Sequence, residues 1–247
     1  MSTEGAPYEL FYWPSIQGRG EFVRLAFEDA RAPYVDVARL PESAGGGVPA
    51  LMKLLRDPSL ATPAFAPPFV RHGDLVVAQT ANILQWLGPR LGLAPADEKG
   101  RLFAHQLQLT VADVVAEVHD THHPISTGLY YEDQKLEAAR RAREFTASRL
   151  PKYLGYLEGV LARGDKAHLV GGAHSYVDLS AFQLMEGLAY AFPRAMARVG
   201  ASLPNLLKLR DRVAARPGVA AYLASPRRLA FNENGIFRRY PELDEPA

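Results

Sequence analysis

The start of the chain alternates between two apolar patterns that predict a strand, a helix and a second strand. The aromatic-rich segment 8–13 is typical of a short strand, and the segment 33–38 predicts another. Between them, one helical face collects Val23, Ala26, Phe27 and Ala30. A strand, a helix and a strand in this order form a βαβ unit, whose crossover implies that the two strands pair in parallel.

A hairpin and a helix follow after an irregular stretch. Residues 40–64 show no regular pattern apart from a possible short helix over residues 50–56. Two apolar runs, "PFV" and "LVVA", are joined by "RHGD", in which Gly73 occupies a turn position, and they predict an antiparallel hairpin. The next segment, "TANILQWLGPRLG", predicts a helix that ends near Pro89 or slightly later.

Long helical stretches replace the strands in the rest of the chain. Ser175 and Asp178 are spaced as a capping box at the start of one of these helices. We therefore predict a fold of the α/β plus all-α class, with an α/β domain over residues 1–93 and a helical-bundle domain over residues 97–247. The tail after Pro226 is predicted to be irregular.

Composition and charge narrow the function classes. Of the 247 residues, 48% are apolar and 22% are charged, as in a globular protein with a real core, and the net charge of +1 lacks the electrostatic footprint of nucleic-acid binding. No apolar run approaches the roughly 20 residues of a membrane span. The first residues do not resemble a signal peptide, so we expect an intracellular protein. The chain has no cysteine, so any sulfur chemistry requires a sulfur that arrives with a ligand.

Four motifs, in this order, resemble those of the cytosolic glutathione transferases. They are "YWP" near the start, "GRGEFVRLAFE", the stretch "PPFVRHGDLVVAQTANILQWLG", and the "SYVD" box, and together they span most of the chain. The tyrosine-type classes, pi and sigma above all, are the most similar. The resemblance implies a thioredoxin-like βαβ-ββα domain that binds glutathione as co-substrate, and a helical domain that shapes an electrophile pocket. It also implies a homodimer, a cytoplasmic location and a role in detoxification.

The resemblance gives different roles to the two prolines that precede the hairpin. Pro68 occupies the position of the family's cis-proline, whose cis bond turns the preceding backbone toward the ligand and is also a feature of the fold. Pro67 occupies the position whose N–H and C=O both bind the cysteinyl backbone of glutathione. Because proline has no N–H, the resemblance implies one lost hydrogen bond, worth about 1 kcal/mol, and weaker or altered glutathione binding.

Tyr12 is the candidate for thiol activation, because it ends the first predicted strand beside the start of the first helix. A thiol with a pKa of about 8.5 is mostly protonated at neutral pH. A tyrosine hydroxyl, with a pKa of about 10, can lower that pKa by donating a hydrogen bond to the thiolate. Packing at a domain edge is the alternative role. The loop after Pro14 is one residue longer than in the pi class, so a backbone amide or Ser15 could replace the tyrosine.

Gln79 and Thr80 begin the helix after the hairpin and are candidates for binding the γ-glutamyl end of glutathione. The free N–H groups of a helix N-terminus attract an anion such as the γ-glutamyl carboxylate. A plain threonine N-cap is a compatible interpretation, since the cap position is the site. Glu117 resembles an acidic residue that reaches the γ-glutamyl ammonium of the partner subunit, and a helix-surface glutamate is the alternative.

Three cations are candidates for the glycyl carboxylate of glutathione: Arg19, Lys53 and Arg56. Arg19 matches a position of the family, whereas Lys53 lies in a loosely aligned segment. A solvated surface charge is the alternative for each of them.

The electrophile pocket is assigned to Trp13, Ile16, His119 and His123. Core packing is the alternative for Trp13 and Ile16. His119 and His123 are four residues apart, so one helical face could hold both, as in some zinc sites. No sharp motif such as H-E-x-x-H accompanies them, and we predict no metal.

These observations predict a transferase that conjugates the thiolate of glutathione to a small apolar electrophile, by addition or by aromatic substitution. Two alternatives remain open at this point. One is a transferase-like binding or scaffold protein without efficient catalysis, and the other is a glutathione-dependent isomerase or peroxidase.

Overall fold

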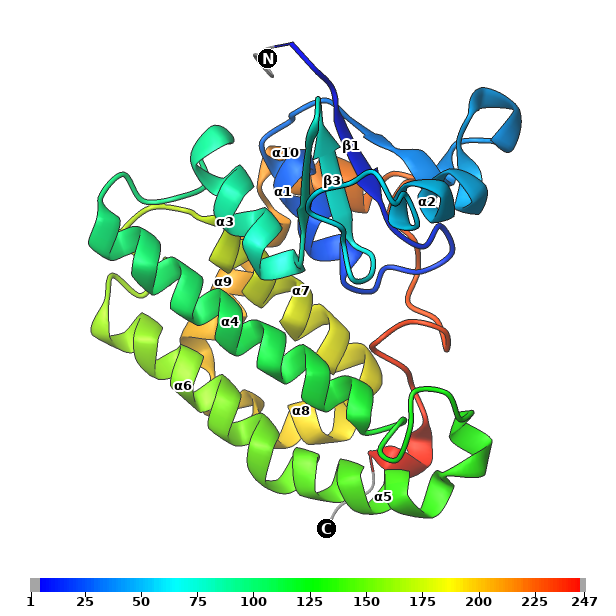
Figure 1. Cartoon of the computed structure of the whole chain (residues 1–247). Coiled ribbons are helices and arrows are strands. Elements are labelled where there is room, and N and C mark those ends of the chain that lie inside the picture. The colour runs from blue at the N-terminus through cyan, green and yellow to red at the C-terminus, as the bar shows by residue number, and fades with distance from the viewer. Residues whose placement is uncertain (1–4, 245–247) are drawn as a thin grey trace.

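The computed structural model describes residues 5–244, which form a four-stranded sheet with its helices and a larger helical unit beside it (Figure 1). The strands lie in the order β2-β1-β3-β4. β1 (Tyr8–Phe11) pairs in parallel with β2 (Tyr34–Asp36) and antiparallel with β3 (Phe69–His72). β3 pairs antiparallel with β4 (Leu75–Ala78) across a turn in which Gly73 has a φ of 60°. The predicted βαβ unit and hairpin are therefore confirmed.

The helices follow the predicted order. Those of the first part are α1 (Gly20–Asp29), the short η1 (Val37–Arg39) and η2 (Glu42–Ala44), α2 (Gly47–Leu55) and α3 (Thr80–Arg90). Those of the second part are α4 (Glu98–Asp120), η3 (Tyr131–Asp133), α5 (Lys135–Glu144), the π-helical η4 (Phe145–Arg149), α6 (Leu150–Arg163), α7 (Tyr176–Ala191), α8 (Pro193–Gly200), α9 (Pro204–Ala214), α10 (Pro217–Leu223) and η5 (Pro241–Leu243). No helix within residues 5–244 combines the length and the apolar character needed to cross a membrane.

The local signals at the helix ends behave as the sequence indicates. The capping box of Ser175 and Asp178 is present at the start of α7, where the Asp178 carboxylate accepts the Ser175 N–H at 2.8 Å. The helix α3 continues past Pro89 and ends at Arg90, within the predicted range. After α3 the described chain contains helices and no further strand. The domain bounds at residues 93 and 97 stay a prediction.

The helix α1 lies between the sheet and the helical unit and is buried along its whole length. Val23 and Phe27 pack against the sheet, whereas Phe22, Leu25 and Ala26 on the other side belong to the core of the helical unit. A helix with two apolar faces must find a partner for each. The two parts of the molecule therefore share α1 as common core.

Residues 224–244, which we call the C-terminal strap, run from the end of α10 back along both parts of the molecule (Figure 1). The Gln17 side-chain amide donates to the Leu229 carbonyl at 2.5 Å, and the Asn232 amide donates to the Ser15 carbonyl at 3.0 Å. Apart from η5, the strap contains no helix or strand, as predicted. It therefore borders the loop that follows Tyr12.

Candidate functional site

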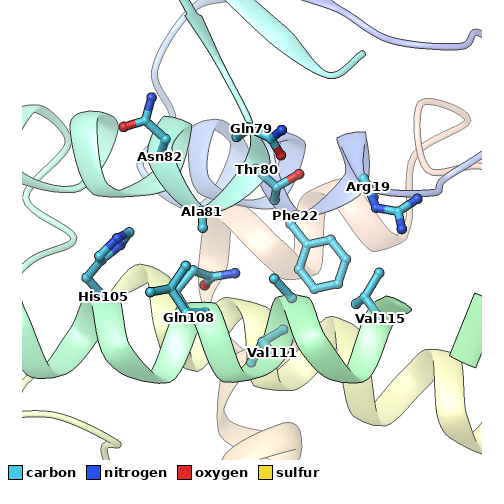
Figure 2. A pocket seen from close by; sticks show the side chains of 12 residues that line it. Arg19, Phe22, Gln79, Thr80, Ala81, Asn82, His105, Gln108, Val111 and Val115 are labelled. Atoms are coloured by element: carbon cyan, nitrogen blue, oxygen red, sulfur yellow. The ribbon is translucent and has the colours of Figure 1, made fainter. Parts of the chain in front are cut away.

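A cavity of about 310 Å³ lies between the start of α3 and the middle of α4 (Figure 2). One wall is the first turn of α3 with the preceding Gln79, and the opposite wall is a row of α4 side chains that includes His105, Gln108 and Val115. Arg19 and Phe22, from the start of α1, close one end. The cavity therefore combines a helix N-terminus, the guanidinium of Arg19 and a largely apolar floor.

The sequence places free donors at the first wall. Gln79 precedes α3 with a φ of 69° and a ψ of 119°, a left-handed conformation that is uncommon outside glycine and often occurs at functional sites. This backbone lets α3 begin at Thr80, so the N–H groups of its first turn face outward from the helix end. The Thr80 Oγ1 is buried and forms no hydrogen bond with any residue of 5–244. Both residues predicted to bind the γ-glutamyl end thus line the cavity.

Tyr12 lies beneath the turn that leads into α1, is only 4% exposed and does not itself line the cavity. Its hydroxyl oxygen accepts the Arg19 backbone N–H at 2.8 Å. Gly18 and Gly20 allow this approach, because a Cβ at residue 18 would lie 2.1 Å from the Tyr12 hydroxyl oxygen. Burial raises the pKa of Tyr12 above its usual value of 10, and the hydrogen bond from Arg19 offsets only part of that effect. The phenol is therefore neutral near pH 7, and its own proton remains available to an acceptor.

The three candidate cations lie in different places. Arg19 lines the cavity and, within the part of the chain that the structure describes, has no ion-pair partner. Lys53 lies on α2 and lines a different hollow, together with Glu9 and Arg71. Arg56 is exposed after the end of α2. The structure therefore brings Arg19, but neither of the other two, to the cavity that Thr80 lines.

The residues around the N-terminal loops are placed as follows. The peptide bond between Pro67 and Pro68 is cis, directly before β3, as the resemblance implies. Trp13 is 36% exposed and Ile16 is half-buried, and neither lines the cavity. Ser15 is exposed, and its carbonyl is held by the C-terminal strap.

Glu117 is engaged by its own chain. Both carboxylate oxygens accept from Arg149 at 2.6 to 3.0 Å, Tyr153 donates at 2.7 Å, and Arg141 lies 3.5 Å away. Burial opposes ionisation, but the hydrogen bonds from Arg149 and Tyr153 outweigh it and lower the pKa of Glu117. Glu117 does not line the cavity. The predicted contact with a partner subunit's ligand therefore requires a carboxylate that is already paired.

Three histidines cluster at the end of α4. The His119 and His123 rings stack with centroids 4.9 Å apart, and His122 bridges the His123 ring and the Ile236 carbonyl of the C-terminal strap at 2.5 and 2.8 Å. Burial and the nearby Arg238 lower the pKa of His122 to about 3 and that of His123 to about 4, so both rings are neutral near pH 7. Within residues 5–244, no group of three or more acidic, histidine or cysteine side chains is placed to hold a metal ion.

The α4 wall of the cavity contains residues that the sequence analysis did not single out. His105, Gln108, Ala112 and Val115 follow one another at intervals of three or four residues, the spacing of one helical face. Figure 2 shows the side chains of His105 and Gln108 rising from α4 toward the α3 wall. Helical periodicity could have identified this face, but it does not indicate what the face meets.

Comparison with known proteins agrees with this architecture. The family "Glutathione S-transferase, C-terminal domain" matches residues 119–226. A glutathione S-transferase P of Capra hircus is 26% identical over 233 residues, which cover 93% of this chain and 98% of the relative, and that of Bos taurus is 25% identical over 93% and 97%. The crystal structure of the glutathione S-transferase from Ascaris lumbricoides superposes with a TM-score of 0.64 at 24% identity, covering 88% of this chain and 96% of that one.

A pi-class enzyme shows the same fold over nearly its whole length. The Onchocerca volvulus pi-class glutathione S-transferase superposes with a TM-score of 0.69 at 21% identity, covering 92% of this chain and 98% of that one. Sequence relatives and structural neighbours thus agree across both parts of the molecule. Residues 119–226 thus match a glutathione S-transferase domain, and the chain as a whole is similar to glutathione S-transferases over nearly its whole length.

Proposed function

We propose that this glutathione transferase activates the thiol of glutathione through the Tyr12 hydroxyl and conjugates it to a small apolar electrophile. The environment of the Tyr12 hydroxyl supports this assignment. Its phenol is kept neutral by burial, it accepts the Arg19 N–H at 2.8 Å, and its own proton finds no acceptor within residues 5–244. A hydroxyl that already accepts a hydrogen bond is a better donor, because hydrogen bonds in a chain polarise one another.

The chemistry requires a thiolate sulfur at neutral pH. A hydrogen bond from Tyr12 to the sulfur stabilises the thiolate and lowers the thiol pKa, and the thiol proton leaves to solvent. The sulfur then attacks an electron-poor carbon. With a haloaromatic substrate a carbon–sulfur bond forms, and the carbon–halogen bond breaks as halide leaves with the bonding pair. The positive charge of Arg19 favours the anionic sulfur in the same region.

The remaining contacts of glutathione follow from the positions of the candidate residues. The first turn of α3, with Gln79 and Thr80, receives the γ-glutamyl carboxylate. Arg19 is the cation that we assign to the rest of the peptide, with Lys53 as a second candidate for its glycyl carboxylate. Pro67 contributes its carbonyl to the cysteinyl backbone but has no N–H to donate.

The electrophile pocket is assigned to Trp13, Ile16, His119 and His123. Burial lowers the pKa of both histidines, so neutral imidazoles rather than cations would face the substrate near pH 7. This supports a small, uncharged and largely apolar electrophile.

A homodimer is the second part of the proposal. Phe65 is 92% exposed, and Leu102 and Leu109, seven residues apart on one face of α4, are 62% and 48% exposed. Apolar side chains of this size are common at interfaces between subunits. A cytoplasmic location and a role in detoxification belong to the same proposal, and they rest on the similarity to glutathione S-transferases.

The test replaces the Tyr12 hydroxyl and leaves the ring. We expect Tyr12→Phe to lower kcat/KM for a chlorinated dinitrobenzene about 10- to 100-fold, since a hydrogen bond to an anion is worth about 1.5–3 kcal/mol. The pKa of the bound glutathione thiol, measured by thiolate absorbance, should rise by an amount that corresponds to the same free energy. Tyr8→Phe is the matched control, because Tyr8 stacks on His72 in the sheet, whereas the Tyr12 hydroxyl contacts the turn that holds Arg19. Full conjugating activity of Tyr12→Phe would refute the assigned role, and binding of S-hexylglutathione without any conjugation by the unaltered protein would indicate a scaffold.

A further inference from the structure

One asparagine of the C-terminal strap differs from the other asparagines of the chain. The sequence has four asparagines, and only Asn234 is followed by a glycine. The side-chain amides of the other three each donate a hydrogen bond; they are Asn82, Asn205 and Asn232. Asn234 is exposed, and its side-chain amide forms no hydrogen bond within residues 5–244. This amide is therefore free to turn toward the peptide nitrogen that follows it.

That following nitrogen, the N–H of Gly235, is also unpaired. It donates to no acceptor in the described part of the chain, although the Gly235 carbonyl accepts from the Arg238 guanidinium at 2.8 Å. Glycine has no Cβ that could shield the nitrogen. The backbone does not require a glycine here, because Gly235 does not have a left-handed φ and an added Cβ would meet nothing closer than 4.0 Å. A side-chain amide beside an unshielded nitrogen of its own chain favours an intramolecular reaction between them.

On its N-terminal side, Asn234 is joined to the place where the strap meets the loop after Tyr12. The Asn232 side-chain oxygen accepts the Asn234 N–H at 3.0 Å, and the nitrogen of the same amide donates to the Ser15 carbonyl at 3.0 Å. The two bonds use opposite ends of one amide, so the turn at Asn234 orients the group that binds Ser15. A change in the backbone at Asn234 therefore reaches Ser15 through one side chain.

On the C-terminal side, the strap is held more firmly. Ile236 and Phe237 are both buried, and the Ile236 carbonyl accepts from His122 at 2.8 Å. Phe237 packs against Gly187, where an added Cβ would lie 2.4 Å from the Phe237 ring. Two buried apolar side chains resist displacement more than one exposed hydrogen bond does. If the chain between the two attachments lengthens, the attachment at Ser15 is therefore the one that breaks.

We propose that Asn234 is a site of spontaneous deamidation, and that its conversion to isoaspartate releases the strap from Ser15. The Gly235 nitrogen loses its proton and attacks the Cγ of Asn234. The new carbon–nitrogen bond closes a cyclic imide, and the Cγ–Nδ2 bond breaks as ammonia leaves with a proton. Water then opens the imide at either carbonyl, which gives aspartate or isoaspartate with a new carboxylate.

The two products differ in their effect on the strap. Aspartate adds a charge and leaves the main chain unchanged. In isoaspartate the main chain runs through the former side chain, so it becomes one carbon atom longer between the two attachments. The reaction needs only water besides the protein, and the inference does not depend on the proposed function.

The first test follows the conversion in the folded protein. The unaltered protein is incubated at mildly alkaline pH, where the attacking nitrogen loses its proton more readily. Its peptides are then analysed by mass spectrometry, and isoaspartate is identified by labelling with an isoaspartyl methyltransferase. We expect Asn234 to be converted about tenfold or more faster than the other three asparagines in the same sample.

Gly235→Ala is the matched control, because the structure has room for the added Cβ while the asparagine and its exposure stay the same. The methyl group shields the attacking nitrogen and should slow the conversion of Asn234 about tenfold or more. Conversion of Asn234 no faster than that of the other asparagines, or equally fast in Gly235→Ala, would overturn the inference.

The second test measures the attachment of the strap. Hydrogen exchange of residues 15–17 and 229–233 is compared between the converted protein and Gly235→Ala that was incubated in the same way. We expect both segments to exchange faster after conversion, by about two- to tenfold, as for the loss of one hydrogen bond. Freshly prepared Asn234→Asp adds the charge without lengthening the chain and should exchange like the unaltered protein. Unchanged exchange after conversion would refute the release of the strap, and equal acceleration in Asn234→Asp would refute the longer main chain as its cause.

Discussion

Glu21 offers the sharpest test of how the two parts of the molecule are held together. Its carboxylate, at the start of α1, is completely buried and lies 3.2 Å from the Arg24 guanidinium. It also accepts the hydroxyl of Tyr222 at 2.7 Å and a guanidinium N–H of Arg228 at 2.5 Å, and both residues come from the end of the helical unit. Glu21→Gln keeps the shape of the side chain and removes its charge.

The size of the effect follows from the contacts that survive. Removing one partner of a buried ion pair typically costs about 3–5 kcal/mol, since it leaves an uncompensated charge. Arg24 keeps Asp36 at 2.7 Å, and Arg228 keeps the Gln183 amide oxygen at 2.9 Å. The new amide oxygen can still accept from Tyr222. We therefore expect the lower end of the range, a loss of about 3 kcal/mol in the free energy of unfolding.

Urea unfolding followed by circular dichroism measures this loss, at one fixed protein concentration so that any subunit association is equal in both samples. Glu186→Gln is the control, because the Glu186 side chain is 38% exposed and lies 3.8 Å from Arg210. Exposed pairs of this kind contribute less than about 1 kcal/mol. A loss for Glu21→Gln no larger than that of the control would refute the reasoning that a buried charge network joins the two parts.

Two further substitutions test the site and the pH dependence of stability. Gly18→Ala places a Cβ 2.1 Å from the Tyr12 hydroxyl oxygen and should reduce kcat/KM about as much as Tyr12→Phe, as measured in the conjugation assay. Burial raises the pKa of Asp29, but His174 at 3.2 Å and Arg216 at 2.6 Å outweigh it, so the net pKa lies below the usual 3.8. A depressed pKa stabilises the fold above about pH 4 and loses this effect as the pH falls, so the stability gap between the unaltered protein and Asp29→Asn should shrink between about pH 5 and pH 2 in urea titrations.

The prediction for Gly18→Ala has a control, and the prediction for Asp29→Asn has an outcome that would contradict it. Gly92 has a φ of 68°, and no atom lies within 4 Å of the position that a Cβ would occupy there, so Gly92→Ala carries the same backbone strain, about 1 kcal/mol, without a clash at the site. Equal activity losses for Gly18→Ala and Gly92→Ala would show that strain, and not displacement of Tyr12, is responsible. A stability gap for Asp29→Asn that does not change with pH would contradict the assigned ionisation.

The sequence predicted the parts of the site that depend on local signals. Thr80 was identified because a helix start has a recognisable pattern, and the structure places it on the cavity wall. Gln108 was missed, because α4 is amphipathic and its pattern does not show which polar residues at the border of the apolar face meet α3. The ligand contact of Glu117 stays a prediction, but the sequence did not show that Arg149, which lies 32 residues further along the chain, binds this carboxylate. Partners at such a separation leave no trace in the local pattern.

The fold shows the same contrast at α1. The spacing of Val23, Ala26 and Phe27 correctly predicted a helix with one apolar face. It did not predict that Glu21 and Arg24, on other faces, are buried as well. Charged residues are normally exposed, and only their tertiary partners can make burial tolerable.

The shared helix α1 has a consequence for the order in which the molecule can be completed. Glu21 is bonded to Tyr222 and Arg228, which are 201 and 207 positions later in the chain. On the ribosome, α1 and its sheet emerge long before these partners exist, although early domains generally fold first. One side of α1 therefore stays uncovered until these partners are synthesised, and we expect chaperones to bind the first part during that time. A chain truncated before α10 should remain in that state, and should be recovered bound to chaperones or as aggregate.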